Sequence, residues 1–473
     1  MAVSATTRIV SVNPATEEVL ASFDPFTPDE IDGALAEVDD AFRVWRERPL
    51  DERAVPMRRL ASLLRDRSER YARLITIEMG KPITEAKGEI EKCAWACEHF
   101  AEHAKRYLAD MVIPSNATRS LVAFEPLGVV LAVMPWNFPF WQVVRFAAPA
   151  FMAGNGALLK HASNVPQCAL AIEEAVRDAG FPEGLLRTVL VSGGAIEPII
   201  ADDRIRAVTL TGSSDTGSRI AELAGRALKK TVLELGGSDP FIVLADADLD
   251  AATATAVRAR NQNAGQSCIA AKRFIVERGV AESFERAFAK AVESLAVGDP
   301  LDARTQIGPL ARRDLRETLE RQVQTSLRMG ARAAAATGPL DGKGYFYRPT
   351  VLTEVEEEMP VFKEETFGPV AAVVRVSDAD AAVRVANDSP YGLGANLWTR
   401  DVARAERLAR RIESGSVFIN GMVASDPRLP FGGIKRSGYG RELSEFGIRE
   451  FTNVQTIWIG PAQGTQSKAP QSE

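Results

Sequence analysis

Residues 128–136 read GVVLAVMPW, a continuous apolar run that is rich in β-branched side chains. Such a run is typical of a strand buried on both faces of a sheet, because a half-exposed strand alternates apolar with polar residues. Further apolar runs follow, with helical segments between them. Strands that alternate with helices predict a parallel sheet with crossover connections. The runs are GALLKHA (156–162), RTVLVSG (187–193), AVTLTGS (207–213) and TVLELGG (231–237).

A second series of apolar runs begins at PFIVLADADLD, residues 240–250. We place a domain boundary near residue 236, at the Gly236-Gly237 pair between the two series. The sequence therefore predicts an α/β fold of two Rossmann-like domains with parallel sheets. The first would comprise residues 1–109 and 127–236, and the second residues 237–447. The later runs of the second series are KRFIVE (272–277), PVAAVVRV (369–376), GANLWTRD (394–401) and GSVFING (415–421).

Most of the first hundred residues are expected to be helical. Apolar residues recur at three- and four-residue spacing in 29–47, 50–80 and 86–111. Gly80 and Pro82 would end the second of these helices.

Two segments fit neither domain. Residues 110–126 have the pattern of an extended ribbon, and residues 448–461 that of a lone strand. Strands with exposed edges tend to find partners. We therefore predict a small β element for self-association into a homodimer or homotetramer; ordinary edge strands of one sheet are the alternative. The polar stretch 462–473 is expected to be a flexible tail.

Composition narrows the class of protein. The chain has 57 Lys and Arg against 63 Asp and Glu, a formal charge of −6. This mild acidity argues against a nucleic-acid binder, which normally carries a basic face. The N-terminus has no long apolar region, and no apolar run reaches the ~18 residues of a membrane span. Four cysteines in 473 residues are not a disulfide framework, so we predict a cytoplasmic protein without a membrane partner.

Individual residues suggest chemistry only weakly. Cys268 ends NQNAGQSC, where Gly265 suits a tight turn that presents a thiol, although a free cysteine is more often a small buried hydrophobe. Glu234 ends an apolar strand. It could be a general base at the carboxyl end of a parallel strand, or a helix cap or ion-pair partner. Asn137 in PWNFP could donate to an oxyanion or satisfy loop backbone groups. Gly212 and Gly217 in LTGSSDTG would let backbone N–H groups approach a phosphate.

Six motifs together are much more specific. They occur in this order along one chain, which resembles the aldehyde dehydrogenase superfamily over essentially its whole length. Three longer stretches are similar to the succinate-semialdehyde dehydrogenase branch: residues 134–155, LLKHASNVPQCAL (158–170) and LELGGSDPFIV (233–243). The motifs are PWNFP (135–139), LTGS (210–213), ELGG (234–237), GQSC (265–268), EETFGPV (364–370) and PFGGIKRSGYGRE (430–442).

The resemblance implies an active site. The first domain would bind the cofactor and the second would be catalytic. Cys268 would attack the aldehyde carbon as a thiolate, while the Asn137 amide and the Cys268 backbone N–H hold the oxyanion. After hydride transfer to a nicotinamide cofactor, Glu234 would activate the water that hydrolyses the thioester. Relatives that acylate coenzyme A typically lack this glutamate.

The resemblance also implies the cofactor contacts. NAD-linked members commonly carry Glu where this chain has Ser163. A carboxylate would repel a 2′-phosphate whereas Ser can donate to it, so we predict NADP, with NAD left open as a second cofactor. The other implied contacts are Lys160 at the adenosine ribose, Gly212 and Ser213 at the pyrophosphate, Glu365 at the nicotinamide ribose, and Phe367, Trp136, Asn137 and Leu235 around them.

The substrate is expected to carry a carboxylate. Arg145 matches an arginine that semialdehyde dehydrogenases use for the distal carboxylate, and guanidinium can bind it in bidentate fashion; a surface ion pair is the plainer alternative. Some relatives carry a second arginine where this chain has Gln262, so recognition would be shared with the SDPR loop that begins at Ser425. Succinate semialdehyde is the predicted substrate, and glutarate semialdehyde or a plain aliphatic aldehyde stays open.

Two other functions are compatible with parts of the sequence. His99 and His103 fit the H-x-x-E-H zinc pattern on a predicted helix, with Cys93 and Cys97 one or two turns away. No further zinc ligand can be identified, and we predict no metal. A catalytically silent member of the family is the other alternative, and the presence of Cys268, Glu234 and Asn137 together argues against it.

Overall fold

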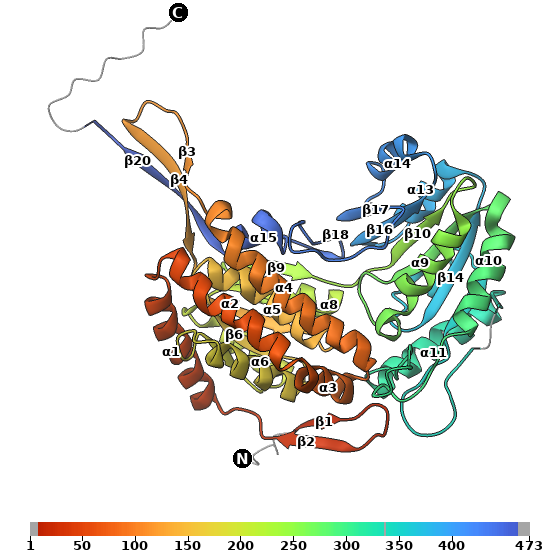
Figure 1. Cartoon of the computed structure of the whole chain (residues 1–473), viewed down its shortest axis with the longest axis horizontal. Coiled ribbons are helices and arrows are strands. Elements are labelled where there is room, and N and C mark those ends of the chain that lie inside the picture. The colour runs from red at the N-terminus through yellow and green to blue at the C-terminus, as the bar shows by residue number, and fades with distance from the viewer. Residues whose placement is uncertain (1–7, 335–336, 462–473) are drawn as a thin grey trace, which may run out of the picture.

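The computed structural model describes residues 8–334 and 337–461, so the predicted tail at 462–473 lies outside the described residues. Two sheets, each flanked by helices, form the two halves seen in Figure 1. The first is six-stranded in the order β19-β9-β8-β5-β6-β7, and only β19 is antiparallel to its neighbour. Its strands are β5 (Val129–Met134), β6 (Gly156–His161), β7 (Leu186–Thr188), β8 (Ile205–Thr211), β9 (Lys230–Glu234) and β19 (Gly438–Tyr439).

The strand order of the first sheet indicates where a ligand would bind. From β5 the chain first moves outward through β6 and β7, then returns to build β8 and β9 on the other side. The carboxyl ends of β5 and β8 therefore flank a topological switch point, which is where open α/β sheets form their binding crevice. PWNFP follows β5, and LTGS spans the last two residues of β8 and the turn after it, so the two motifs meet at this crevice.

The second sheet repeats this plan. It has seven strands in the order β12-β13-β14-β11-β10-β16-β17, all parallel except β12. The prediction of an α/β fold with two parallel sheets is confirmed. The strands are β10 (Asp239–Val243), β11 (Ala271–Glu277), β12 (Arg332–Ala333), β13 (Thr350–Thr353), β14 (Val370–Val376), β16 (Gly394–Trp398) and β17 (Ser416–Ile419); the short β15 (Tyr391–Gly392) and β18 (Ile434–Lys435) pair with each other.

The N-terminal region is largely helical, as predicted, but differs in two details. A hairpin of β1 (Ile9–Val12) and β2 (Val19–Phe23) precedes the helices, and the single helix expected over 50–80 is two helices that meet at Arg67. Gly80 ends the second of them with a left-handed φ of 85°. The helices here are α1 (Pro28–Trp45), α2 (Leu50–Asp66), α3 (Ser68–Met79) and α4 (Ile83–Tyr107).

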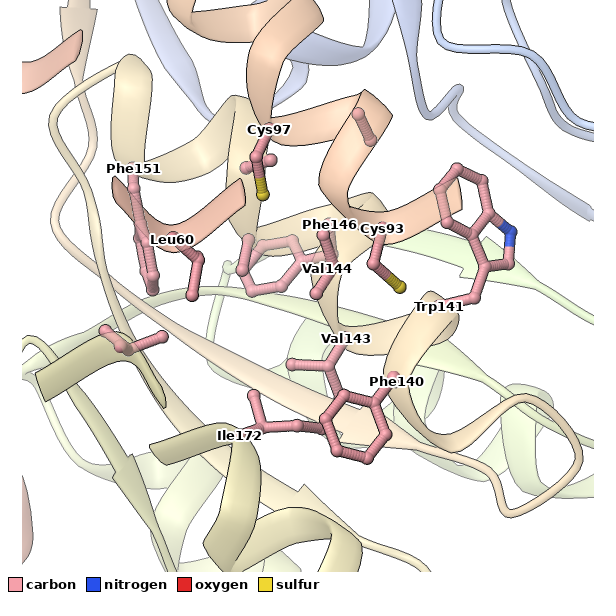
Figure 2. Close-up of a cluster of buried hydrophobic side chains, with 14 of the residues drawn as sticks. Leu60, Cys93, Cys97, Phe140, Trp141, Val143, Val144, Phe146, Phe151 and Ile172 are labelled. Carbon is pink, nitrogen blue, oxygen red and sulfur yellow. The ribbon is translucent and has the colours of Figure 1, made fainter. Parts of the chain in front are cut away.

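The helix α5 (Pro139–Met152) is buried along its whole length and packs against α4 and α2. Its apolar side chains, including Phe140, Phe146 and Phe151, belong to the same buried cluster as Cys93 and Cys97 of α4 (Figure 2). Both thiols therefore belong to the hydrophobic core. The remaining helices are α6 (Pro166–Asp178), α7 (Ile196–Ala201), α8 (Ser214–Arg226), α9 (Leu249–Asn261), α10 (Arg278–Glu293), α11 (Arg313–Arg328), α12 (Pro360–Lys363), α13 (Ala379–Asn387), α14 (Val402–Ala409) and α15 (Ser444–Glu450).

A third, separate sheet has the order β20-β4-β3. The lone C-terminal strand, β20 (Thr452–Ile459), pairs along its full length with β4 (Arg119–Pro126), and β3 (Met111–Val112) lies on the other side of β4. Figure 1 shows this sheet projecting from the body of the protein. The two segments that fitted neither domain are thus partners of each other.

The strand β19 does not follow the predicted domain limits. The other predicted limits stay a prediction. β19 falls within residues 237–447, yet it pairs with β9 in the first sheet. The PFGGIKRSGYGRE segment therefore crosses back to the first domain and brings Glu442 next to it. No described helix is both long and apolar enough to span a bilayer.

Candidate active site

The loop before Cys268 has an unusual backbone. Asn263, Ala264 and Gly265 have φ values of 55°, 51° and 73°, three left-handed residues in succession. Such a conformation is strained for residues other than glycine and persists only where surrounding contacts enforce it. Here Glu85 accepts from the Asn263 N–H at 2.7 Å, and Arg260 donates to the Gly265 carbonyl at 2.7 Å. The loop is therefore held by fixed contacts from α4 and α9.

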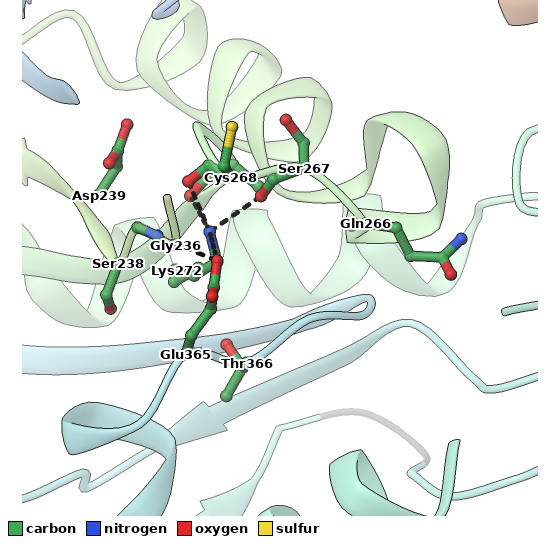
Figure 3. A network of polar contacts seen from close by, with 12 residues as sticks. Gly236, Ser238, Asp239, Gln266, Ser267, Cys268, Lys272, Glu365 and Thr366 are labelled. Atoms are coloured by element: carbon green, nitrogen blue, oxygen red, sulfur yellow. Dashed lines mark hydrogen bonds and ion pairs between the residues drawn. The ribbon is translucent and has the colours of Figure 1, made fainter. Parts of the chain in front are cut away.

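Lys272 secures the other side of the same loop. Its Nζ donates to the carbonyls of Ser267 and Cys268, each at 2.9 Å, and lies 3.6 Å from the Glu365 carboxylate (Figure 3). Glu365 in turn accepts from the Gly237 N–H at 3.0 Å. A side chain at Gly236 would meet this carboxylate, because a Cβ there would lie 2.4 Å from Glu365 Oε2. Gly236 of ELGG thus leaves room for Glu365, and Gly237 leaves room for the Cys268 carbonyl, which a Cβ there would approach to 2.5 Å.

Cys268 lines two cavities. One of about 340 Å³ extends between α4, α5 and the loop around Ser425, and another of about 260 Å³ extends over the carboxyl ends of β5 and β8. The thiol therefore stands where molecules in the two cavities would meet. Burial raises the pKa of Cys268 to about 12, and the nearby charges of Arg145 and Lys272 oppose that rise.

Asn137 lies beside this cysteine. Its buried side-chain amide donates to the Gln266 backbone carbonyl at 3.2 Å. The backbone carbonyl of Asn137 accepts from Asn263 Nδ2 at 2.8 Å. One amide hydrogen is engaged with the loop, which leaves the second for a group bound near the thiol. The predicted pairing of Asn137 with Cys268 is thus geometrically possible.

Glu234 is buried at the end of β9, and neither of its carboxylate oxygens has a hydrogen-bond partner among the described residues. Burial and the nearby Glu442 carboxylate raise the pKa of Glu234 to about 8, whereas Arg145 lowers it. A carboxyl group with such a pKa can exchange a proton near neutral pH. Arg145 and Glu442 form a buried ion pair, so the three side chains make one cluster.

The 260 Å³ cavity contains most of the residues predicted to bind the cofactor. Ser213 caps α8, accepting from the Thr216 N–H at 3.3 Å, and the N-terminus of this helix suits an anion. Trp136 and Phe367 meet edge to face with ring centroids 5.7 Å apart. Lys160 and Ser163 lie outside this cavity, at and just beyond the carboxyl end of β6, with Ser163 exposed. The predicted residues that line the cavity are Trp136, Asn137, Gly212, Ser213, Leu235, Glu365 and Phe367.

These residues fit a dinucleotide. Gly217 of α8 packs so tightly against Leu235 that a Cβ would lie 2.5 Å from its side chain. Helix α8 is thereby drawn close to the end of β9, as close helix–strand packing in dinucleotide sites requires.

All three predicted substrate residues line the 340 Å³ cavity: Arg145, Gln262 and Ser425. Gln262 is exposed and Ser425 is buried. Arg145 is engaged by Glu442 and stacks over Phe431, with its guanidinium carbon 4.7 Å from the ring centroid. Of the SDPR loop, Ser425 reaches the cavity, whereas Arg428 pairs with its neighbour Asp426 at 2.6 Å.

Comparison with known proteins identifies the family. Residues 2–457 match the protein family described as "Aldehyde dehydrogenase family". This chain belongs to the aldehyde dehydrogenase family. A Synechocystis protein named "Probable succinate-semialdehyde dehydrogenase [NADP(+)]" is 51% identical over 451 residues, 95% of this chain and 99% of that protein. A Mycobacterium tuberculosis protein named "Succinate-semialdehyde dehydrogenase [NADP(+)] 1" is 49% identical over 454 residues, with the same coverage.

A solved relative has the same fold. The succinic semialdehyde dehydrogenase of Streptococcus pyogenes, crystallised in complex with NADP+, superposes with a TM-score of 0.93 at 38% identity, covering 96% of this chain and 100% of that one. The predicted family is thereby confirmed.

The zinc alternative finds no support in the geometry of this aldehyde dehydrogenase. Within residues 8–334 and 337–461, no group of three or more His, Cys, Asp or Glu side chains is placed to hold a metal. His99 is buried and its Nε2 lies 3.1 Å from the Tyr107 hydroxyl. Burial lowers the pKa of His99 to about 4, as for a packed neutral imidazole.

Several site residues escaped the sequence prediction. Lys272 and Glu442 lie within or next to recognised motifs but were given no role. Arg312 lines the 260 Å³ cavity, with its guanidinium carbon 5.6 Å from the centroid of the Trp136 ring. Lys92 lines the 340 Å³ cavity beside Ser425. The signal for Lys92 was its spacing, since it follows Glu85, Gly88 and Glu89 on one face of α4.

Proposed function

We propose that this aldehyde dehydrogenase oxidises succinate semialdehyde to succinate with NADP+. The names of its relatives support the substrate and the cofactor. One structural observation carries the proposal: the Cys268 thiol lies at the meeting point of two cavities, one suited to a dinucleotide and the other lined by cationic side chains. An aldehyde in one cavity and a hydride acceptor in the other would both reach this sulfur.

The chain's own residues would act in sequence. Because the pKa of Cys268 is raised by burial, its thiol must lose a proton before it attacks the aldehyde carbon. Water in the cavity that Cys268 lines can take that proton, which leaves Glu234 available for the later hydrolysis. The Asn137 amide and the Cys268 backbone N–H would hold the oxyanion that forms. The bound nicotinamide supplies a hydride acceptor, and the acyl group remains on Cys268 as a thioester.

Glu234 would then serve hydrolysis. It is buried and its oxygens are free of hydrogen bonds from described residues, so it can accept a proton from a water that enters next to the thioester. Water adds to the thioester carbon, the carbon–sulfur bond breaks, and Cys268 regains its thiol. The carboxylic acid leaves as product.

The cofactor preference rests on Ser163. It lies three residues after Lys160, in an exposed turn, and its hydroxyl can donate to a 2′-phosphate. Lys160 would add a positive charge nearby.

The test compares wild type with Cys268→Ala, following reduced cofactor with succinate semialdehyde and either NADP or NAD. We expect turnover with NADP at low concentration to exceed that with NAD, and we expect the variant to be inactive but to bind cofactor. Turnover only with other aldehydes would contradict the substrate. Undiminished activity in Cys268→Ala would contradict the nucleophile.

We also propose that the β20-β4-β3 sheet joins copies of this chain. Its strands expose apolar side chains that an isolated chain would leave in water, including Val112, Val454 and Trp458. The four free thiols support a reducing compartment, and we place the enzyme in the cytoplasm.

A further inference from the structure

The 340 Å³ cavity, which would hold the substrate and is called the substrate cavity below, is lined by four residues from one face of α4. Glu85, Gly88, Glu89 and Lys92 recur at three- and four-residue spacing, and all line the cavity. Both glutamates already bind other groups of the protein. Glu85 accepts from the Asn263 N–H, and Glu89 accepts from the N–H groups of Phe140 and Trp141 and pairs with the buried Lys81.

The cationic side chains that line the cavity differ in whether a carboxylate of the protein already neutralises their charge. Arg145 pairs with Glu442 in a nearly solvent-free contact, so a substrate carboxylate would compete there with a protein carboxylate. Arg258 lines the cavity from α9, but its side chain is exposed, where solvent weakens an ion pair.

Lys92 is the half-buried cation without such a partner. Its Nζ donates to Ser425 Oγ at 2.7 Å and lies 4.4 Å from the centroid of the Trp141 ring. Among the described residues, no carboxylate lies within 4.0 Å of this ammonium. Burial and the nearby Arg145 lower the pKa of Lys92 to about 8. A partly desolvated charge of this kind gains most from an anion that arrives with the substrate.

We propose that Lys92, together with Ser425, receives the distal carboxylate of the substrate and makes this enzyme prefer aldehydes that end in a carboxylate. The inference rests on the proposed function and deepens it. An ammonium has three N–H donors, and Ser425 engages one of them. Because the Ser425 oxygen accepts from Lys92, its hydroxyl hydrogen is free to donate to the same carboxylate. The two side chains thus form one anion site in the same cavity as the thiol.

The test measures selectivity rather than activity alone. Succinate semialdehyde is compared with butanal, which has the same chain length but no carboxylate, in wild type and Lys92→Met. One charge-assisted hydrogen bond corresponds to about a 10- to 100-fold change. We expect kcat/KM for succinate semialdehyde to fall by about that factor, mainly through KM. We expect kcat/KM for butanal to stay within about threefold, and Lys92→Arg to restore part of the preference.

Two matched variants locate the effect. Lys87→Met removes an exposed lysine of the same helix that pairs with Glu69, and it should leave both substrates unchanged. Arg258→Met removes the exposed cation of the same cavity, and it should reduce the preference less than Lys92→Met. Thermal unfolding of each variant verifies that the fold is retained.

A pH series gives a second readout. Lys92 is faced by Glu89 and Cys93 on its own helix, by Arg145 on α5 and by Asp426 beside Ser425. As the ammonium loses its proton above about pH 8, KM for succinate semialdehyde should rise in wild type. It should not rise in Lys92→Arg, because guanidinium stays protonated. KM for butanal should show no such rise.

The outcomes separate the two proposals. If wild type does not prefer succinate semialdehyde over butanal, the proposed substrate is wrong, and the carboxylate site with it. If wild type shows the preference and Lys92→Met keeps it, or loses both substrates equally, the role of Lys92 is wrong while the proposed function stands.

Discussion

Arg145 and Glu442 form an ion pair whose side chains are only 2% and 4% exposed, next to the Glu234 carboxyl group. The pair joins α5 of the first domain to the segment that carries β19. It also places a carboxylate of the protein on the guanidinium that the family resemblance assigned to the substrate. Arg145 therefore has a structural and electrostatic role whether or not it contacts substrate.

Removing one partner of this pair should destabilise the protein strongly. Arg145→Gln leaves the Glu442 carboxylate buried and uncompensated, which costs about 3–5 kcal/mol of unfolding free energy. Glu442 would then take up a proton at a higher pH. Chemical denaturation of Arg145→Gln and of Arg145→Gln/Glu442→Gln measures the effect, and the double variant should recover part of the loss. A single variant as stable as wild type would show that the pair is not needed for stability.

Glu234→Gln should stop the reaction after one turnover. Its amide cannot take a proton from water, so the thioester should accumulate, and hydrolysis should slow by about 10²–10⁴-fold. Rapid mixing should reveal up to one reduced cofactor per active site and then a stall. Because the base form of Glu234 is needed and its pKa is raised to about 8, wild-type hydrolysis should increase with pH up to about 8 and then level off. A steady rate like that of wild type would assign the base elsewhere.

The Glu234 carboxyl group should also affect stability. Its contribution to stability should fall as pH rises, whereas the rate of hydrolysis should increase. Its pKa in the folded protein lies above the ordinary value of 4.5. The protonated form therefore stabilises the fold at low pH, and this contribution is lost as pH rises through about 8. Glu234→Gln has no charge to bury. Its Tm relative to wild type should be higher at pH 9 than at pH 5, and an unchanged difference between the two pH values would contradict the buried, proton-binding state.

The sequence predicts those features of the fold and the site that depend on residues close together along the chain. The strand at 129–134 and its neighbours were predictable because each continuous apolar run is a local signal. The strands of the third sheet were expected as well, but their pairing was not, because nothing local shows that β20 pairs with β4. Lys92 was missed for the same reason, since its partner Ser425 lies 333 residues away along the chain. Cys268 and Glu234 were found through motifs, whereas the pairing of Arg145 with Glu442 needed the fold.

The third sheet makes the predicted oligomer testable. Trp458 on β20 is 54% exposed in the isolated chain, and burying it against another copy would stabilise an assembly. Trp458→Glu should shift the protein toward a smaller species in light scattering. Leu228→Glu changes an apolar residue that is 94% exposed at the end of α8, so it serves as the matched control. A wild type that is monomeric at micromolar concentration would contradict the proposal.

Charge at position 163 should decide between the two nicotinamide cofactors. Ser163 is exposed in the turn after β6, so a longer side chain can be accommodated without disturbing the core. In Ser163→Glu the carboxylate would repel a 2′-phosphate, and KM for NADP should rise by about 10- to 100-fold, a coupling of roughly 1.4–2.8 kcal/mol. KM for NAD should stay equal or fall, because a carboxylate can accept from the free ribose hydroxyls. Ser163→Gln has the same size without the charge, so it separates the two causes. An equal rise in KM for NADP in both variants would attribute the preference to side-chain volume instead of charge.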